Sequence, residues 1–211
     1  MRTFKKILIF SSVITFLLII AVKLYSSSNG ITDLTKKTGA IGCACHGNHK
    51  PSPNVSVFFS GPDSVAAGET KLFMIKLARG PAITGGFDVA SYSGTLDTTY
   101  LDTTVRRDSS NGELTHRFPK SFVNDTVFWT FKYTAPNTPQ IDTLYAVANS
   151  TNNDGKADTL DQWNFSVNRT VRVYLPIGIL SNELKVNTFI LFQNYPNPFN
   201  ANSKIKFQIS K

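Results

Sequence analysis

The chain has 211 residues, with 22 Lys and Arg against 14 Asp and Glu and a formal net charge of +8. Because residues 1–28 hold four of the basic residues and no acid, the remainder carries 18 basic against 14 acidic side chains. This mild excess, without a Lys/Arg cluster interleaved with aromatic residues, excludes nucleic acid as the expected partner, and the length fits one ordinary domain with extensions.

Residues 1–28 are typical of a signal peptide. Arg2, Lys5 and Lys6 precede an apolar stretch, residues 7–22, that only two serines and a threonine interrupt. A basic start followed by a short apolar run is the pattern of a secretory leader. At 16 residues, the run is shorter than the roughly 20 that a membrane-spanning helix needs. We therefore expect export through the inner membrane, cleavage within residues 25–29, and membrane contact only through this leader.

Residues 29–53 hold most of the potential ligand side chains of the protein. The chain has only two cysteines and three histidines, and four of these five fall within seven residues, at Cys43, Cys45, His46 and His49. The segment is rich in Gly, Asn and Pro, which predicts a loop that precedes the first strand and packs on one end of the body. This gathering of scarce ligand types makes the segment the main candidate site.

Three interpretations of the cluster stay open. A c-type haem is attached through C-x-x-C-H, by two thioether bonds and an axial histidine, and the spacing of Cys43, Cys45 and His46 is one residue shorter. The same three residues, with His49 or His116, supply thiolate and imidazole ligands that suit zinc or copper. Alternatively, Cys43 and Cys45 form a strained disulfide or remain free thiols, and their role is structural.

Residues 54–176 predict a body made of strands, with almost no helix signal. The expected strands are rich in β-branched and aromatic residues and span residues 55–59, 71–77, 86–90, 127–133, 143–148 and 163–174. Val127, Trp129, Phe131 and Tyr133 are spaced by two, so with Tyr145 we expect them to form the core and not a cofactor pocket. This pattern predicts an all-β fold, an antiparallel immunoglobulin-like β-sandwich, followed by a linker at residues 177–189.

The segment 149–161 has two interpretations. With Gly155 at the sixth position of a calcium loop, the ligand positions fall on Ser150, Asn152, Asp154 and Asp161. Charged oxygens are few and the flanking helices are missing, so we favour a turn between strands.

Elsewhere the sequence holds no recognisable Ser-His-acid arrangement, phosphate loop or acid pair. We therefore predict no catalytic residue and do not expect an enzyme.

Several short runs of the body form a recognisable set, at residues 38–47, 85–89, 112–116, 129–131, 148–155 and 161–164. With them, the chain resembles a group of exported bacterial proteins known as choice-of-anchor or Reelin-like domains. Some of these relatives have the full C-x-x-C-H motif and are labelled cytochrome c-like. The resemblance implies a β-sandwich with the Cys-x-Cys-His loop at its N-terminal edge, and His116 and Trp163 near that loop.

Residues 190–211 form a distinct tail. Two prolines in N-Y-P-N-P-F-N, residues 194–200, fix φ and lack amide donors, so we expect a rigid turn without sheet pairing of its own. Ile205, Phe207 and Ile209 then alternate with polar residues, which predicts a strand. The tail resembles the start of the C-terminal sorting domain of the type IX secretion system. This resemblance implies that the type IX machinery sorts the protein to the outer surface or the medium. We expect the sorting domain to be truncated at Lys211.

Together these features predict an exported cell-surface or secreted binding or structural module whose Cys-x-Cys-His site binds a metal. The alternative is a surface redox protein with c-type haem attached at the same site. The extracellular ligand is not predicted.

Overall fold

The computed structural model describes residues 28–39, 41–46, 50–176, 190–200 and 202–208. The chain divides into two compact units, residues 1–175 and 176–211. The predicted linker, and all of the predicted signal peptide except Ser28, lie outside the described residues. Within the described ranges, no helix is long and apolar enough to cross a membrane.

The first unit is built from twelve strands, and all the described residues that form regular structure are strands. Their bounds are β1 Val55–Ser60, β2 Ser64–Ala66, β3 Thr70–Arg79, β4 Thr84–Ser91, β5 Thr95–Asp97, β6 Val105–Arg107, β7 Leu114–His116, β8 Lys120–Ser121, β9 Thr126–Thr134, β10 Gln140–Thr151, β11 Gln162–Phe165 and β12 Arg169–Tyr174.

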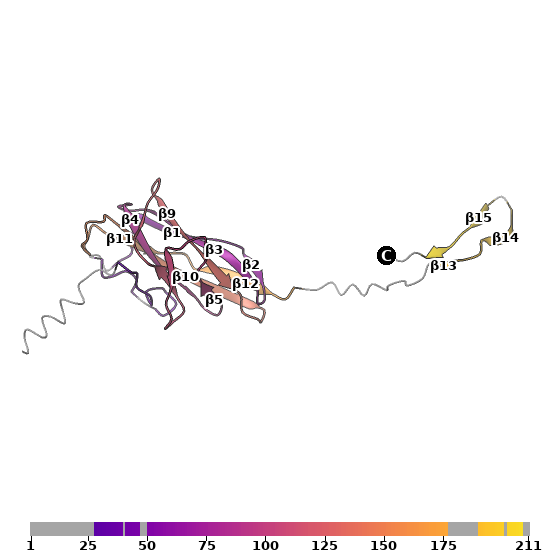
Figure 1. The fold of residues 1–211 in the computed structure, drawn as a ribbon, viewed down its shortest axis with the longest axis horizontal. Coiled ribbons are helices and arrows are strands. Elements are labelled where there is room, and N and C mark those ends of the chain that lie inside the picture. The colour runs from indigo at the N-terminus through magenta and orange to yellow at the C-terminus, as the bar shows by residue number, and fades with distance from the viewer. Residues whose placement is uncertain (1–27, 40, 47–49, 177–189, 201, 209–211) are drawn as a thin grey trace, which may run out of the picture. The chain divides into compact units, whose positions relative to one another are not determined.

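These strands form two sheets that face each other (Figure 1). The first has the order β1-β3-β9-β5; the second has the order β2-β12-β10-β4-β7-β6, with β11 also pairing with β10 and β8 with β4. All pairs are antiparallel except β2 with β12, which is parallel. The prediction of an all-β immunoglobulin-like sandwich is confirmed, with this one parallel pair as a difference.

The predicted strand over residues 163–174 is interrupted. Phe165 pairs with Val147 and Arg169 pairs with Leu144. The three residues between Phe165 and Arg169 therefore lie opposite only two residues of β10. One extra residue makes a β-bulge, which bends the strand and ends the ladder locally. The bulge divides the predicted strand into β11 and β12.

The core lies between the two sheets and is rich in aromatic residues. Trp129, Phe131 and Tyr133 of β9 are fully buried, as the spacing by two predicts, and Phe73 of β3 packs edge-on against Tyr133 at 5.3 Å. Tyr145, expected with them, is half-buried instead. In β10, Leu144 and Ala146 point into the core, so Tyr145 between them points to the opposite face.

Strand β4 is buried on both faces. All eight of its residues, Thr84–Ser91, are buried, although alternate residues of a strand point to opposite sides. One face meets the core, and the other is covered by residues 28–39 and 41–46, here called the N-terminal segment. This segment contacts the outer face of the second sheet, where the Leu34 N–H donates to Asp88 and Gly30 lies against Thr115.

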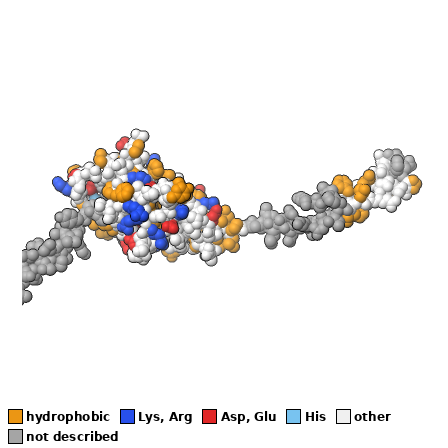
Figure 2. All heavy atoms as spheres, viewed as in Figure 1, with side chains coloured by type: hydrophobic (Ala, Val, Ile, Leu, Met, Phe, Trp, Pro, Cys, Tyr) orange, Lys and Arg blue, Asp and Glu red, His pale blue; other side chains and the backbone are white. Residues whose placement is uncertain are grey.

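Solvent-exposed charges on the body are mixed in sign. Figure 2 shows Lys and Arg side chains interspersed with Asp and Glu over one face, with hydrophobic side chains scattered between them. This mixture agrees with the nearly balanced charge of the chain after residue 28.

The second unit has four short strands, β13 Ile190–Leu191, β14 Tyr195–Asn200, β15 Asn202–Lys204 and β16 Phe207–Gln208. β14 pairs with β15, so the prediction of a turn without sheet pairing is wrong. The two registered pairs, Tyr195 with Lys204 and Asn200 with Asn202, lie on either side of the prolines. This placement needs no amide donor from either proline.

Candidate functional site

The N-terminal segment is held on the sheet by side chains that bind its backbone. Arg106 donates from Nε to the Asn29 carbonyl at 2.7 Å and from Nη2 to the Gly30 carbonyl at 3.0 Å. The backbone N–H of Asp33 donates to Glu113 Oε2 at 2.7 Å, and that of Leu34 donates to Asp88 Oδ2 at 2.9 Å. Without strand pairing, these bonds give partners to several backbone groups of the segment.

Gly42 brings the segment close to Trp163. Its φ is +75°, and a Cβ built on it would lie 2.2 Å from Cζ3 of the Trp163 ring. Only glycine combines this backbone conformation with so close an approach. Since Cys43 follows directly, Trp163 lies near the Cys-x-Cys-His loop.

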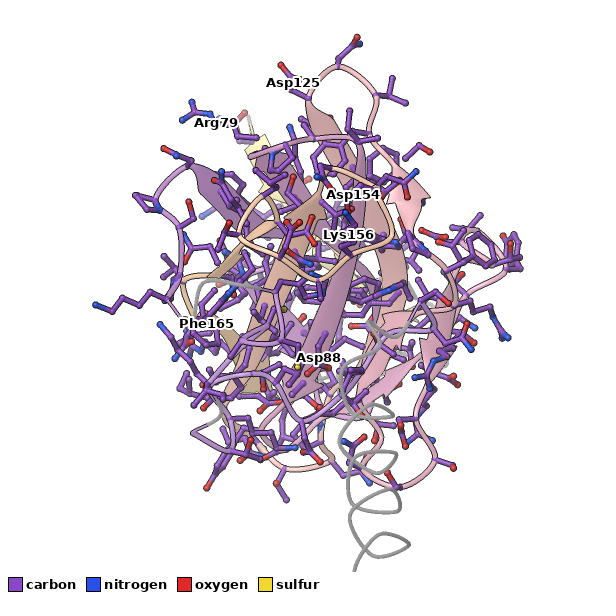
Figure 3. The ribbon with its side chains drawn as sticks, turned by 90° about the vertical axis from the view of Figure 1, so that its left-hand side faces the viewer. Arg79, Asp88, Asp125, Asp154, Lys156 and Phe165 are labelled. Atoms are coloured by element: carbon purple, nitrogen blue, oxygen red, sulfur yellow. The ribbon has the colours of Figure 1, made fainter. Side chains whose placement is uncertain are left out.

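The segment and the sheet enclose a cavity of about 360 Å³. Cys43, Cys45 and His46 line it from the segment, and His116 and Asp88 line it from the sheet. In Figure 3, the loop that carries Asp154 and Lys156 lies above Asp88 in the view, and this loop also lines the cavity. The structure thus gathers four of the five predicted ligand residues around one space, and His49 lies outside the described residues.

His46 is oriented by a buried carboxylate. Its Nδ1 donates to Asp161 Oδ2 at 2.7 Å, and Asp161 is 1% exposed. The other oxygen of Asp161 accepts the backbone N–H of Asn152 at 3.1 Å. A carboxylate on Nδ1 leaves the lone pair of a neutral imidazole on Nε2, which is the arrangement of metal-binding histidines.

His116 is placed differently. The backbone N–H of Phe87 donates to its Nδ1 at 3.1 Å, so Nδ1 is an acceptor and the proton of the neutral ring lies on Nε2. Burial lowers the pKa of His116 to about 4, with the charge of Arg106 adding to the effect. His116 therefore lines the cavity as a neutral hydrogen-bond donor. To bind a metal through Nε2 it would have to give up the bond from Phe87.

The two cysteines are free thiols. Cys45 is exposed and Cys43 is half-buried. Burial raises the pKa of the Cys43 thiol, and its electrostatic interactions with Asp88 and Cys45 raise it further. A thiol in such surroundings stays protonated unless a cation binds it.

Asp88 and Glu113 form a buried acid pair that the sequence analysis missed. They are 1% and 2% exposed, respectively. Burial raises both pKa values, and burial together with the charge of the neighbouring Glu113 raises that of Asp88 well above its usual range. One signal was visible, since Asp88 stands inside the strand G-G-F-D-V-A, where a charged residue is rarely found unpaired.

The described residues hold no group of three or more His, Cys, Asp or Glu side chains placed to bind a metal ion. The predicted set of Cys43, Cys45, His46, His49 and His116 therefore stays a prediction.

The loop 149–161 directs its side-chain oxygens at its own backbone. The N–H of Asp154 donates to Asn152 Oδ1 at 3.1 Å, and the N–H of Lys156 donates to Asp154 Oδ1 at 2.9 Å. These are Asx turns, which Asn and Asp form in connections between strands. The geometry agrees with the turn interpretation.

We expect millimolar calcium to leave the Tm of the protein unchanged, because the oxygens of this loop are already used by its backbone and few are charged. Differential scanning calorimetry with calcium, and with magnesium at equal ionic strength as a control, checks this. A rise in Tm with calcium alone would restore the calcium interpretation.

No protein-family model matches the chain, and no curated protein matches it in sequence. The CARDB domain of a Pyrococcus furiosus protein is similar in structure, at 14% identity over 60% of this chain and 100% of that domain, with a TM-score of 0.37. A second structure of that domain, in complex with di-metal ions, has 14% identity, coverage of 59% and 96%, and a TM-score of 0.34. A PapD-like (ASH) domain of human CEP192 has 9% identity, coverage of 60% and 88%, and a TM-score of 0.28. Similarities this low do not support a functional argument.

Proposed function

We propose that this chain is an exported binding module whose site is the cavity beneath the N-terminal segment, and that Cys43, Cys45 and His46 hold a zinc or copper ion there. The observation that supports this best is the bond of 2.7 Å from His46 Nδ1 to the buried Asp161, beside two free thiols that line the same cavity. That bond leaves the lone pair of a neutral His46 ring on Nε2, where a metal could bind.

The donor set suits a soft or borderline ion. Thiolate and imidazole ligands favour zinc and Cu(I) over magnesium or calcium. Binding would take the proton from each thiol, and the positive charge would offset the burial and negative neighbours that raise the pKa of Cys43. His49, three residues after His46, is the fourth candidate ligand.

Elemental analysis of the exported full-length protein tests the proposal. We expect one zinc or copper ion per chain after loading under reducing conditions, and loss of that ion in the double variant C43S/C45S. The matched control is S52A. The Ser52 hydroxyl donates to Gln162, and Ser52 does not line the cavity. Absence of stoichiometric metal in the parent protein would overturn the metal site.

Replacing Asp161 by asparagine should lower the affinity for the metal about 10- to 100-fold, because the loss of the hydrogen-bond partner of a metal-binding histidine has that effect. D154N removes a charge from the exposed part of the same loop and should leave the affinity nearly unchanged. Competition with a chromogenic chelator measures both. Equal losses in the two variants would mean that only loop charge matters.

The second candidate is a surface redox protein with c-type haem. Both cysteine residues and His46 line a cavity with apolar walls, and these residues would supply the two thioether bonds and the axial ligand. The His116 ring does not offer Nε2 as a second ligand while Phe87 donates to Nδ1. Coexpression with a haem-maturation system decides this: a Soret band that survives denaturation supports haem, and a colourless product excludes it.

We also propose delivery to the outer surface or the medium by the type IX secretion machinery through residues 190–211. The support is the tail motif together with the leader. In a bacterium that has this machinery, deletion of residues 190–211 should leave the protein in the periplasm. Unchanged secretion after the deletion would overturn this route.

A further inference from the structure

The floor of the cavity is formed by two adjacent strands. Asp88 of β4 pairs with Val147 of β10, and Gly86 pairs with Asn149, so Asp88 and Asn149 are diagonal neighbours on the same face of the sheet. Gly86 lies between them without a side chain, and the His116 ring stands above it, since a Cβ on Gly86 would lie 2.2 Å from His116 Cε1. The floor therefore presents two polar side chains, with the His116 ring packed on the Gly86 backbone beside them.

Both polar side chains keep an unused acceptor. Asp88 is 1% exposed and Asn149 is 6% exposed. Among the described residues, no N–H or O–H group of a neighbour donates to Oδ1 of either side chain, and Asp88 forms a side-chain hydrogen bond with Glu113 when the acid pair holds a proton. Buried acceptors are rarely left unpaired, because burial removes their water. Two of them in the lining of one cavity call for hydrogen-bond donors inside it.

The charges around this floor favour a cation. Glu113 and Asp33 lie near Asp88 and raise its pKa, and the half-buried Cys43 also faces it. Asp154 and Asp161 line the cavity, and Lys156 is its one Lys or Arg among the described lining residues. Of the other cations nearby, Lys37 faces Glu113, while Arg106 is bound to the carbonyls of Asn29 and Gly30. A positive group would relieve the mutual repulsion of the buried acids.

The size of the cavity indicates a molecule and not a bare ion. Its volume of about 360 Å³ falls in the range of roughly 300–1,000 Å³ that is usual for sites of small organic ligands. Leu34, Phe87 and Pro119 contribute apolar surface to the lining. The ligand should therefore join a charged, donor-rich end to an apolar part.

We propose that the cavity binds a primary organic ammonium, whose N–H groups donate to Asp88 Oδ1 and Asn149 Oδ1 while its apolar stem packs on Leu34, Phe87 and Pro119. This inference rests on the cavity that the proposed function assigns as the binding site, but not on a metal at Cys43, Cys45 and His46.

Titration of the metal-stripped full-length protein with n-butylammonium, followed by NMR or calorimetry, is the test. We expect saturable binding of one molecule per chain, with n-butanol, which has the same stem and no charge, at least about tenfold weaker. D88N should reduce the affinity for n-butylammonium at least about tenfold, while D125N, which removes an exposed charge outside the cavity, should change it less than about twofold. Equal binding of the amine and the alcohol, equal effects of the two variants, or no saturable binding would overturn the proposal.

Two comparisons keep the outcome clear. If D88N does not fold, the parent protein decides: a preference of at least about tenfold for n-butylammonium over n-butanol supports the proposal, and equal binding overturns it. Because the titration uses metal-stripped protein and elemental analysis of the loaded parent tests the metal site by itself, failure of the metal site and failure of the ammonium site are distinguished.

Discussion

Replacing Gly42 by alanine is expected to lower the free energy of unfolding by about 3 kcal/mol and to loosen the N-terminal segment from the sheet. The positive φ of +75° costs a residue with a Cβ about 1 kcal/mol. A contact of 2.2 Å with the Trp163 ring forces a shift in a packed region, which typically costs about 1–3 kcal/mol. Denaturant unfolding followed by tryptophan fluorescence measures the loss, and hydrogen exchange of the segment shows whether it detaches.

Gly39 supplies the matched control. Its φ is +73°, nearly that of Gly42, but a Cβ there would have no heavy atom within 4 Å. G39A should therefore show the backbone cost alone, about 1 kcal/mol. The difference between the two variants isolates the approach to Trp163. Equal losses would mean that Gly42 is needed only for its backbone conformation.

The second large effect is a loss of folding stability at acidic pH. As the pH falls from 6.5 to about 4, the buried neutral His116 should lower the free energy of unfolding of the body by up to about 3 kcal/mol. In this window the unfolded chain protonates its histidine, whereas the folded protein keeps the ring neutral because burial lowers its pKa to about 4. The unfolded state thus binds more protons, and stability falls as the pH falls.

The variant H116N tests this contribution. Asparagine can still accept the N–H of Phe87 through Oδ1 but does not titrate, so the loss of stability between pH 6.5 and 4 should be smaller in H116N than in the parent protein. Unfolding in urea at several pH values gives the difference. Parallel pH curves for the two proteins would contradict the burial of a neutral His116.

The acid pair of Asp88 and Glu113 changes the pH dependence of stability in the opposite direction to His116. Burial raises the folded-state pKa values of Asp88 and Glu113, so the folded protein keeps their proton to higher pH than the unfolded chain does. Stability from this source is fully present below the unfolded pKa and is lost as the pH rises through the folded pKa. Comparing H116N with its parent removes this common background.

The N-terminal segment explains why the second sheet has unusual buried residues. Asp88, Glu113 and Arg106 are strand or near-strand residues whose polar atoms bind the backbone of that segment. A sandwich without this layer would leave those atoms facing water. The segment therefore both covers the polar side chains of the sheet and forms part of the cavity lining.

The sequence by itself determined the class of fold and the neighbourhood of the site. Spacing by two at Trp129, Phe131 and Tyr133 predicts their shared buried face, because the side chains of a strand alternate strictly between its two sides. The bulge within residues 163–174 and the pairing of β14 were beyond such patterns, since they depend on which backbone lies opposite.

Only the tertiary structure decided how the site is built. The bond from His46 to Asp161 and the acid pair of Asp88 and Glu113 join residues that are far apart in sequence. A charged residue within a strand suggests that Asp88 has a partner, but no local pattern identifies which residue it is. The role of His116 likewise depends on the Phe87 amide of a neighbouring strand. The proton positions and charges of such groups are set by burial and by partners across the fold, which a linear pattern of residue types does not contain.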